Sequence, residues 1–175
     1  ISKTFTVAVT DVNEAPTLTV PTGGSVTEDA VTSTITGRLT GADPEGGTLS
    51  YAVVGSAASG GSYTVTGTYG TLVLNASSGS YTYTLNNSAS AVQALGASSS
   101  VTESFSVQLS DGTNTPAAQA LSFTINGAND APTILVSNLS SIAENSVNAV
   151  VATLTGSDID GDSITIALTG SGRDD

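Results

Sequence analysis

The chain has 175 residues, enough for one large domain or for one complete repeat with parts of its neighbours. Its 15 acidic and 3 basic residues give a formal net charge of −12, which argues against nucleic-acid partners and anionic membrane surfaces. The absence of Cys and His from the sequence rules out disulfides, Ser–His–Asp and Cys nucleophiles, and His-based zinc sites. No apolar run is long enough to span a membrane.

Short strands separated by turns are predicted along most of the chain. The first alternating segment is Phe5-Thr6-Val7, and later segments place apolar side chains on one face at every second position. These faces are formed by Leu72 and Leu74; by Tyr81, Tyr83 and Leu85; by Phe105, Val107 and Leu109; and by Leu121, Phe123 and Ile125. Turn signals separate the segments at residues 43–47, 59–61, 78–79 and 111–112. Residues 89–95 could form one helical turn, and the remainder predicts an all-β protein of antiparallel β-sandwich domains.

The sequence repeats itself with a period of about 116 residues. Residues 13–17 (NEAPT) recur as 129–133 (NDAPT), 26–29 (VTED) as 142–145 (IAEN), and 39–46 (LTGADPEG) as 154–161 (LTGSDIDG). The strand-like segment before the first copy, 5–7 (FTV), matches 123–125 (FTI) before the second. We therefore predict a tandem array in three pieces: the last strand of one unit (1–13), a complete unit (14–131) and the first strands of a following unit (132–175).

Acidic residues gather around the two predicted junctions, while the strand interiors are nearly uncharged. The groups lie at 11–14, 28–29, 43–45, 111, 130, 144, 158–162 and 174–175, and Glu103 alone stands apart. Turn chemistry explains isolated pairs such as Asp111-Gly112, but it explains less well why Glu, a poor turn former, recurs in the same places. Because clustered carboxylates repel one another unless a cation joins them, the pattern favours metal binding.

Calcium is the cation that this ligand set favours, since it takes roughly 6–8 oxygen ligands from carboxylates, amides, backbone carbonyls and water. Residues 158–162 offer three carboxylates in a turn that contains Gly161. An EF-hand would need Gly and Glu where this chain has Ser163 and Thr169. Magnesium is a weaker candidate because it is seldom held by protein-only cages, and zinc is disfavoured by the lack of His and Cys.

Several motifs of the complete unit resemble a known family. They are 26–29 (VTED), 69–75 (YGTLVLN), 81–85 (YTYTL), 91–96 (AVQALG), 105–112 (FSVQLSDG) and 125–132 (INGANDAP). Together they are similar to the VCBS repeat of very large bacterial surface proteins, and they cover most of residues 14–132. The flanking pieces resemble bacterial cadherin-like domains through 11–16 (DVNEAP), 143–145 (AEN) and 158–160 (DID). The sandwich domains are therefore expected to be of the immunoglobulin- or cadherin-like kind.

The resemblance implies cadherin-type calcium sites, in which acidic linker residues meet carboxylates of the following domain and a Glu of the preceding one. At the first junction the implied ligands are Asp11, Asn13, Glu14, Asp43, Glu45 and Asp111. At the second they are Glu28, Asn129, Asp130, Asp158 and Asp160, with Asp162 as a further candidate, while Glu144 would serve a later junction. The chain departs from the pattern twice: Gly127 stands where the first linker has Asp11, and residues 43–45 read Asp-Pro-Glu rather than Asp-x-Asp.

The function that the resemblance implies is not catalytic. The chain would be a calcium-stiffened extender segment of a large extracellular adhesin of the RTX type, serving cell adhesion and biofilm formation at the bacterial surface. Its partners would be the adjacent repeats, with no nucleic acid and no membrane insertion of this segment. Two alternatives stay open: a subunit of a calcium-dependent surface layer or extracellular filament, which would bind other copies, and a carbohydrate-binding accessory module of a secreted enzyme.

Catalysis and sugar binding both require aromatic surfaces that this chain supplies poorly. A glycosidase-like carboxylate pair would need an aromatic-lined cleft, and the chain has no Trp, 5 Tyr and 3 Phe. A sugar platform could use Tyr51, Tyr63, Tyr69, Tyr81 and Tyr83. Since Tyr81 and Tyr83 share a face of one predicted strand, we expect this face to be core, with the hydroxyls reaching the rim.

Overall fold

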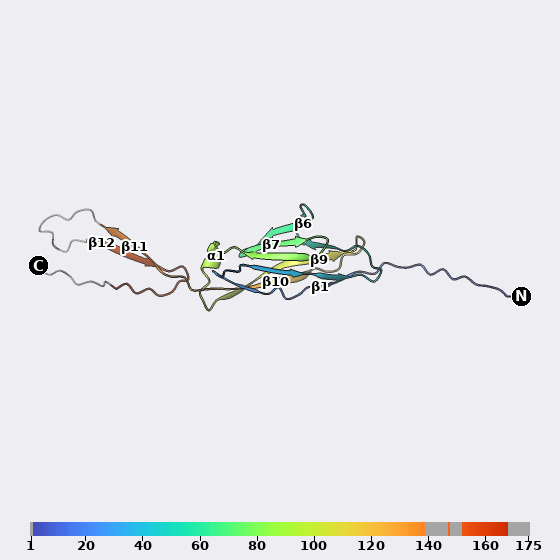
Figure 1. The fold of residues 1–175 in the computed structure, drawn as a ribbon, viewed down its shortest axis with the longest axis horizontal. Helices are drawn as coiled ribbons and strands as arrows, with labels where there is room; N and C mark the ends of the chain where they lie inside the picture. Colours follow the sequence, from blue (N-terminus) through green and yellow to red (C-terminus); the bar gives the residue numbers. More distant parts are fainter. Residues whose placement is uncertain (1, 139–146, 148–151, 168–175) are drawn as a thin grey trace.

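A computed structural model describes residues 2–138, 147 and 152–167. Within these residues the regular secondary structure is β-strand apart from one helical turn, which confirms the predicted all-β class. Figure 1 shows a sandwich with the N-terminal segment extending from one end and a two-stranded sheet beyond the other. Glu144 and the acidic pair at 174–175 lie outside the described residues. No helix in the described part of the chain is long and apolar enough to cross a membrane.

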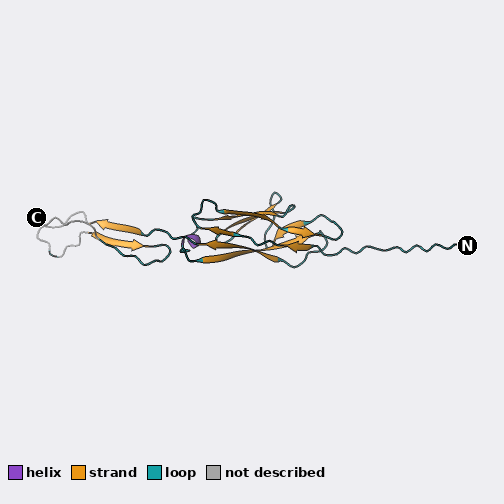
Figure 2. Ribbon diagram, turned by 60° about the horizontal axis from the view of Figure 1, so that its bottom comes forward, coloured by secondary structure: helices purple, strands orange, loops and turns teal. Residues whose placement is uncertain are grey.

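The sandwich consists of two four-stranded sheets, seen as two layers in Figure 2. The first sheet has the order β2 (Ser25–Thr27), β10 (Gln119–Asn126), β9 (Ser100–Ser110), β5 (Ser50–Val53). The second has the order β3 (Thr34–Arg38), β8 (Ser80–Leu85), β7 (Gly70–Asn75), β6 (Ser62–Thr66). These pairings are antiparallel except that β2 runs parallel to β10. The short edge strand β2 therefore departs from the predicted antiparallel pattern.

The core lies between the two sheets and contains the side chains that alternation assigned to inward faces. All of the apolar side chains predicted to face inward are buried, including Leu72, Val107 and Leu121 at 0% exposure. Tyr83 of β8 stacks on Phe123 of β10, with ring centroids 4.3 Å apart and an interplanar angle of 12°. Tyr51 and Tyr81 are also buried, while Tyr63 and Tyr69 are partly buried against the core. Tyr81 and Tyr83 are therefore core residues, as predicted, rather than an exposed sugar platform. The Tyr83 hydroxyl does not reach the rim as expected, because it is buried in a hydrogen bond to Glu103.

One helical turn, α1 (Ser90–Gln93), lies at the end of the sandwich from which β10 leaves (Figures 1 and 2). It falls within the predicted stretch 89–95. Val92 is fully buried and Leu95, two residues after the turn, is 9% exposed, so both anchor this segment in the core. The helical turn is therefore held in place beside the second junction.

Two small sheets sit next to the two junctions. β1 (Thr17–Thr19) pairs with β4 (Thr40–Ala42), and β11 (Thr133–Asn138) pairs with β12 (Ala152–Ser157). Leu18 lies opposite Gly41 in the first pair, and Ile134 lies opposite Gly156 in the second. The two copies of the sequence repeat therefore pair their strands in the same register.

The N-terminal segment differs from its prediction. Residues 2–13 are exposed and form no strand, although Phe5-Thr6-Val7 matches Phe123-Thr124-Ile125 of β10. The difference lies in the neighbours, because β10 is flanked by β9 and β2 whereas the described residues give the N-terminal segment no strand to pair with. Alternating sequence needs a hydrogen-bonding partner to become a strand.

Candidate metal centres at the two ends of the sandwich

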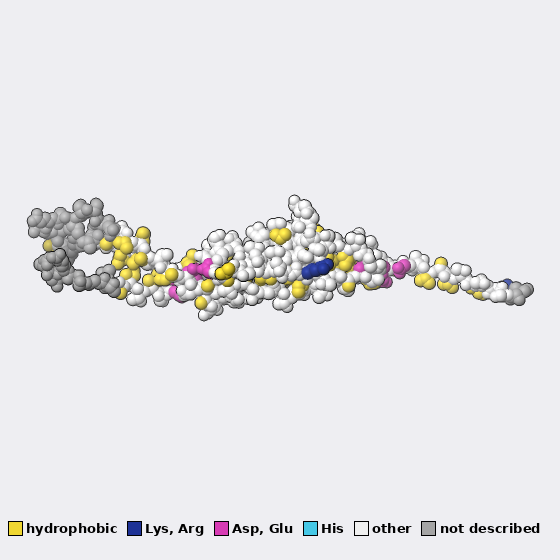
Figure 3. Space-filling view, viewed as in Figure 1, with side chains coloured by type: hydrophobic (Ala, Val, Ile, Leu, Met, Phe, Trp, Pro, Cys, Tyr) yellow, Lys and Arg dark blue, Asp and Glu magenta, His cyan; other side chains and the backbone are white. Residues whose placement is uncertain are grey.

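Acidic side chains gather at both ends of the sandwich, while the flank shown in Figure 3 carries almost none. At the first end the linker meets the turn after β4 and the turn after β9. At the second end the linker after β10 meets the loop after β2 and the turn after β12. Because each end brings together segments far apart in the sequence, the carboxylate grouping is a product of the fold.

The turn after β4 is built around Asp43. Asp43 Oδ1 accepts hydrogen bonds from the backbone N–H groups of Glu45 and Gly47, both at 3.0 Å. Gly46, between these two donors, has φ 72°, a value that Gly adopts without strain. The other carboxylate oxygen, Asp43 Oδ2, is buried and has no hydrogen-bond partner among the described residues.

The turn after β12 repeats this arrangement around Asp158. Asp158 Oδ1 accepts from the N–H groups of Asp160 (3.0 Å) and Asp162 (3.2 Å), again two and four residues further on. Gly161 has φ 80° and occupies the place of Gly46. Two turns about 115 residues apart are therefore built by equivalent hydrogen bonds. The two copies of the repeat thus have the same atomic arrangement in these turns of the candidate sites.

Each linker is tied to its turn by a matching backbone contact. Glu14 N–H donates to Glu45 Oε2 at 3.2 Å, and Asp130 N–H donates to Asp160 Oδ2 at 2.7 Å. The resemblance implies that the members of each pair belong to one site, and the hydrogen bonds show that they lie in contact. Residues 43–45 read Asp-Pro-Glu, and the longer Glu45 side chain makes at the first junction the contact that Asp160 makes at the second.

The first junction also includes Asp111, from the turn after β9. Asp111 Oδ1 accepts from the N–H groups of Asn114 (2.6 Å) and Thr113 (2.7 Å), and Oδ2 accepts from Asn13 Nδ2 (2.8 Å). The Asn114 N–H first, then Asn13 and Thr113, lower the pKa of Asp111. The carboxylate is therefore held in its charged form beside the linker.

Glu14 and Glu45 make the first junction electrostatically unfavourable without a cation. The side-chain hydrogen bond with Glu14 is the main cause that raises the pKa of Glu45, and the negative charges of Glu14 and Asp43 raise it further. Asp11 lies on the exposed segment, and the described residues give its carboxylate no hydrogen-bond partner. The fold links five of the six predicted ligands in pairs, Asn13 with Asp111 and Glu45 with both Glu14 and Asp43, and leaves Asp11 apart. Among the described residues, no three carboxylates converge at this junction.

Glu28 is the most buried acidic residue of the second junction, at 2% exposure. It follows β2, and the parallel pairing of β2 with β10 places it where the linker begins; its N–H donates to the Asn126 carbonyl at 2.9 Å. Burial, followed by the charges of Asp130, Asp29 and Asp160, raises the pKa of Glu28, while the N–H of Ala128 opposes the rise. Glu28 thus lies near the other predicted ligands of this junction.

Carboxylate oxygens converge within one turn of the second junction, the turn after β12. One carboxylate oxygen from each of Asp158, Asp160 and Asp162 lies within 4.8 Å of the others. Asp130 Oδ2 and Asp160 Oδ1 are buried without a hydrogen-bond partner among the described residues. Burial, followed by the charges of Asp29, Asp160 and Asp158, raises the pKa of Asp130. Asp130 Oδ2 and Asp160 Oδ1 are thus desolvated among negative charges, an arrangement that is costly unless a cation is shared between them.

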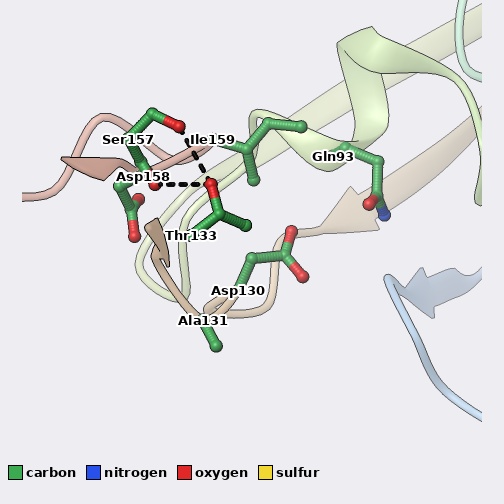
Figure 4. A pocket seen from close by; sticks show the side chains of 7 residues that line it. All are labelled: Gln93, Asp130, Ala131, Thr133, Ser157, Asp158 and Ile159. Carbon is green, nitrogen blue, oxygen red and sulfur yellow. Dashed lines mark hydrogen bonds between the residues drawn. The ribbon is translucent and has the colours of Figure 1, made fainter. Parts of the chain in front are cut away.

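Asp130 lies in a hollow between the sandwich and the β11–β12 pair (Figure 4). Gln93 descends from α1 toward it, and Asp158 lines the same hollow from the other side of Thr133. Thr133 Oγ1 is hydrogen-bonded to Ser157, which fixes the wall formed by β11 and β12. Asn129 is exposed, and its Nδ2 donates to the Asp130 carbonyl at 2.7 Å.

Gly127 explains why the second linker lacks an equivalent of Asp11. A Cβ atom on Gly127 would lie 1.9 Å from the Leu95 carbonyl oxygen, so the chain after α1 leaves no room for a side chain. Three amide side chains at the junctions were not predicted: Gln93 and Asn114 contact the predicted ligands Glu28 and Asn13, and Asn87 contacts Asp29, the neighbour of Glu28. No residue pattern marks them, because they reach the acidic residues only through the tertiary fold.

The fold and these sites define a class: a β-sandwich module with oxygen-rich acidic clusters at both ends. The bacterial cadherin-like domain family matches residues 13–127, about two thirds of the chain. The chain belongs to this family. A search of curated proteins finds no match to it.

The family match changes one expectation from the sequence. The cadherin-like resemblance was assigned to the flanking pieces, but the matched region is the complete unit itself. Nothing found supports the VCBS repeat for that unit. Bacterial cadherin-like domains are typically structural modules without catalytic activity and are generally found in extracellular or surface proteins.

Proposed function

We propose that calcium ions bind at the two junctions and stiffen a tandem array of cadherin-like units in a bacterial surface protein. The observation that carries the proposal is a pair of buried oxygens, Asp130 Oδ2 of the linker and Asp160 Oδ1 of the following piece, for which the described residues supply no hydrogen-bond partner. A cation shared by these oxygens would join the two pieces directly. The ligand set consists of hard oxygen atoms, which suits calcium.

The proposed action is mechanical. Without a cation, the like charges of Glu28, Asp130 and Asp160 repel one another across a linker of a few residues, so the hinge opens. With calcium, ligands from both sides share one centre and the hinge is locked. Sites in extracellular modules have dissociation constants of roughly 10⁻⁴–10⁻³ M, so such a site fills outside the cell and stays empty inside it. Stiffening would then follow export.

We further propose that the parent protein is an adhesin, with the segment acting as a spacer between the cell surface and the binding region. The motif resemblance to very large bacterial surface proteins supports this role, as does the membership of a family generally found at the cell surface. The assignments to VCBS repeats, to the RTX type and to biofilm formation rest on the motif resemblance alone.

Small-angle X-ray scattering of the full chain tests the mechanical proposal. In millimolar calcium we expect the distance distribution of a rod, and with a chelator we expect a shorter mean end-to-end distance and a broader distribution. Asp160→Asn removes one charged ligand and should behave in calcium like the chelated wild type. Ser104→Ala, on the outer face of β9, is the control and should respond to calcium as the wild type does. The same rigid rod with and without the chelator would refute the proposal.

A further inference from the structure

Two neutral amide side chains hold the two adjacent carboxylates that follow β2. Gln93 Nε2 of α1 donates to Glu28 Oε1 at 2.8 Å. Asn87, three residues before α1, makes a reciprocal pair with Asp29: Asn87 Nδ2 donates to Asp29 Oδ1 at 2.6 Å, and Asp29 N–H donates to Asn87 Oδ1 at 3.1 Å. One short segment, residues 87–93, therefore fixes both carboxylates.

The contact with Asn87 supports an unusual backbone conformation. Asp29 has φ 54°, the one positive value among the described residues other than Gly. Such a conformation is uncommon for a residue with a side chain, although Asp and Asn tolerate it best. The two hydrogen bonds between Asp29 and Asn87 offset its cost. Asp29 contributes negative charge to the second junction, since its charge raises the pKa of both Glu28 and Asp130.

The carboxylate of Glu28 keeps capacity for a cation while it is held. Each carboxylate oxygen offers about two acceptor positions. Oε1 uses one for Gln93, and Oε2 uses one for the N–H of Ala128 at 3.3 Å. Each oxygen therefore retains one position, and the group is fixed in orientation without being saturated.

The choice of amides over cationic side chains has a chemical consequence. An amide N–H orients a carboxylate but brings no net charge, so the negative charge stays available to a metal ion. Lys or Arg in the same place would neutralise that charge and compete with the metal. The sequence has only three cations, Lys3, Arg38 and Arg173, and none lies in residues 87–93.

We propose that Gln93 and Asn87 are positioning residues for the calcium site of the second junction, turning Glu28 and Asp29 toward Asp130. α1 would then set the affinity of this site, because Val92 anchors the helical turn in the core at 0% exposure. Partners that orient metal ligands in this way typically contribute about 10–100-fold to metal affinity. The inference rests on the proposed calcium site.

Calcium titration calorimetry on the full chain tests the inference, with thermal unfolding in chelator as the second measurement. Gln93→Met keeps the length of the side chain and removes its donor, and Asn87→Ala removes both contacts with Asp29 from a half-exposed loop. Each should weaken calcium binding at the second junction by about 10–100-fold. The first junction should keep its affinity. If Gln93→Met fails to fold, Asn87→Ala carries the test.

Gln108→Met is the matched control. Gln108 of β9 resembles Gln93 in being a half-buried amide, but it lies away from the second junction. Its Nε2 donates to the backbone carbonyl of Pro116 at 3.2 Å. Its loss should leave both calcium affinities unchanged. This control separates loss of positioning from a general loss of stability.

Gln93→Lys gives a readout that a merely structural role would not produce. An ammonium group beside Glu28 should raise the unfolding midpoint in chelator and at the same time weaken calcium binding at least tenfold. Unchanged calcium affinity in Gln93→Met, Asn87→Ala and Gln93→Lys would overturn the inference while leaving the proposed calcium site intact. A wild-type chain that binds no calcium at the second junction would overturn both.

Discussion

At the scale of single residues, the most informative side chain is the acidic one outside both junctions. Glu103 of β9 is 7% exposed and crosses the core to Tyr83 of the other sheet, whose hydroxyl donates to Glu103 Oε2 at 2.8 Å. Glu103 Oε1 accepts from the N–H groups of Thr68 and Tyr69, in the turn between β6 and β7. Burial, followed by the contact with Glu103, raises the pKa of Tyr83, so this hydroxyl stays a donor. Glu103 therefore joins the two sheets and a turn.

Removing either partner of this core contact should destabilise the domain. Tyr83→Phe leaves Glu103 Oε2 without its donor, and Glu103→Gln places an amide NH₂ among N–H and O–H donors. We expect each to lower the free energy of unfolding by about 1–3 kcal/mol, measured by urea unfolding in chelator. Calcium affinity should be unchanged, because neither residue lies at a junction. A change below about 0.5 kcal/mol, the range of ordinary surface substitutions, would contradict the role of this contact.

The carboxylates of the second junction predict an unusual pH dependence in the absence of calcium. The raised pKa values of Glu28 and Asp130 mean that the folded chain binds these protons more tightly than the unfolded chain. Stability should therefore fall as pH rises from the ordinary values, 4.5 for Glu28 and 3.8 for Asp130, through the raised ones, and then level off. The lowered pKa of Asp111 acts in the opposite sense and below its ordinary 3.8.

Urea midpoints over a pH series, with and without calcium, measure this dependence. With calcium the direction should reverse between the ordinary and the raised pKa values, because protons compete with the ion for the same oxygens. The same slope in both buffers would show that the ion does not bind these groups.

At the scale of elements, Gly127 provides a test of how α1 limits the second junction. Gly127→Asp would restore the linker carboxylate that the first junction has in Asp11. The added Cβ would meet the Leu95 carbonyl oxygen at 1.9 Å, so the segment after α1 would have to move. We expect the free energy of unfolding to fall by about 1–3 kcal/mol and calcium affinity to fall rather than rise. Tighter calcium binding by Gly127→Asp would contradict this packing constraint.

The elements also show what the sequence could and could not predict. Alternation predicted the inward faces of β7, β8, β9 and β10, and the repeat predicted that residues 43–47 and 158–162 would form equivalent turns. Alternation also places Glu103 on the inward face with Phe105 and Val107, yet its charge marked it only as an outlier. The contact between Gln93 and Glu28 joins residues 65 positions apart, so it depends on how α1 packs and has no local signal. The parallel pairing of β2 likewise has no signal in the sequence of β2, because it depends on where this strand joins the edge of the sheet, beside β10.

At the scale of the whole molecule, calcium should act as a ligand of the folded, straight form. By mass action, each site adds about 2.7 kcal/mol to stability when free calcium is 100-fold above its dissociation constant. The unfolding temperature of the full chain should therefore rise with calcium concentration, and Asp160→Asn should reduce the rise. Calorimetric scans across a calcium series measure this effect. An unfolding temperature that is independent of calcium would argue against binding at either junction.

The central claim is that one cation joins the linker to the following piece at the second junction. A crystal structure of the chain grown in calcium tests this most directly. The account predicts an ion coordinated by oxygens of Asp130 and Asp160 at roughly 2.3–2.6 Å, with about 6–8 oxygen ligands in all. Asp130 and Asp160 well ordered in that crystal, with water or protein hydrogen bonds in place of an ion, would contradict it.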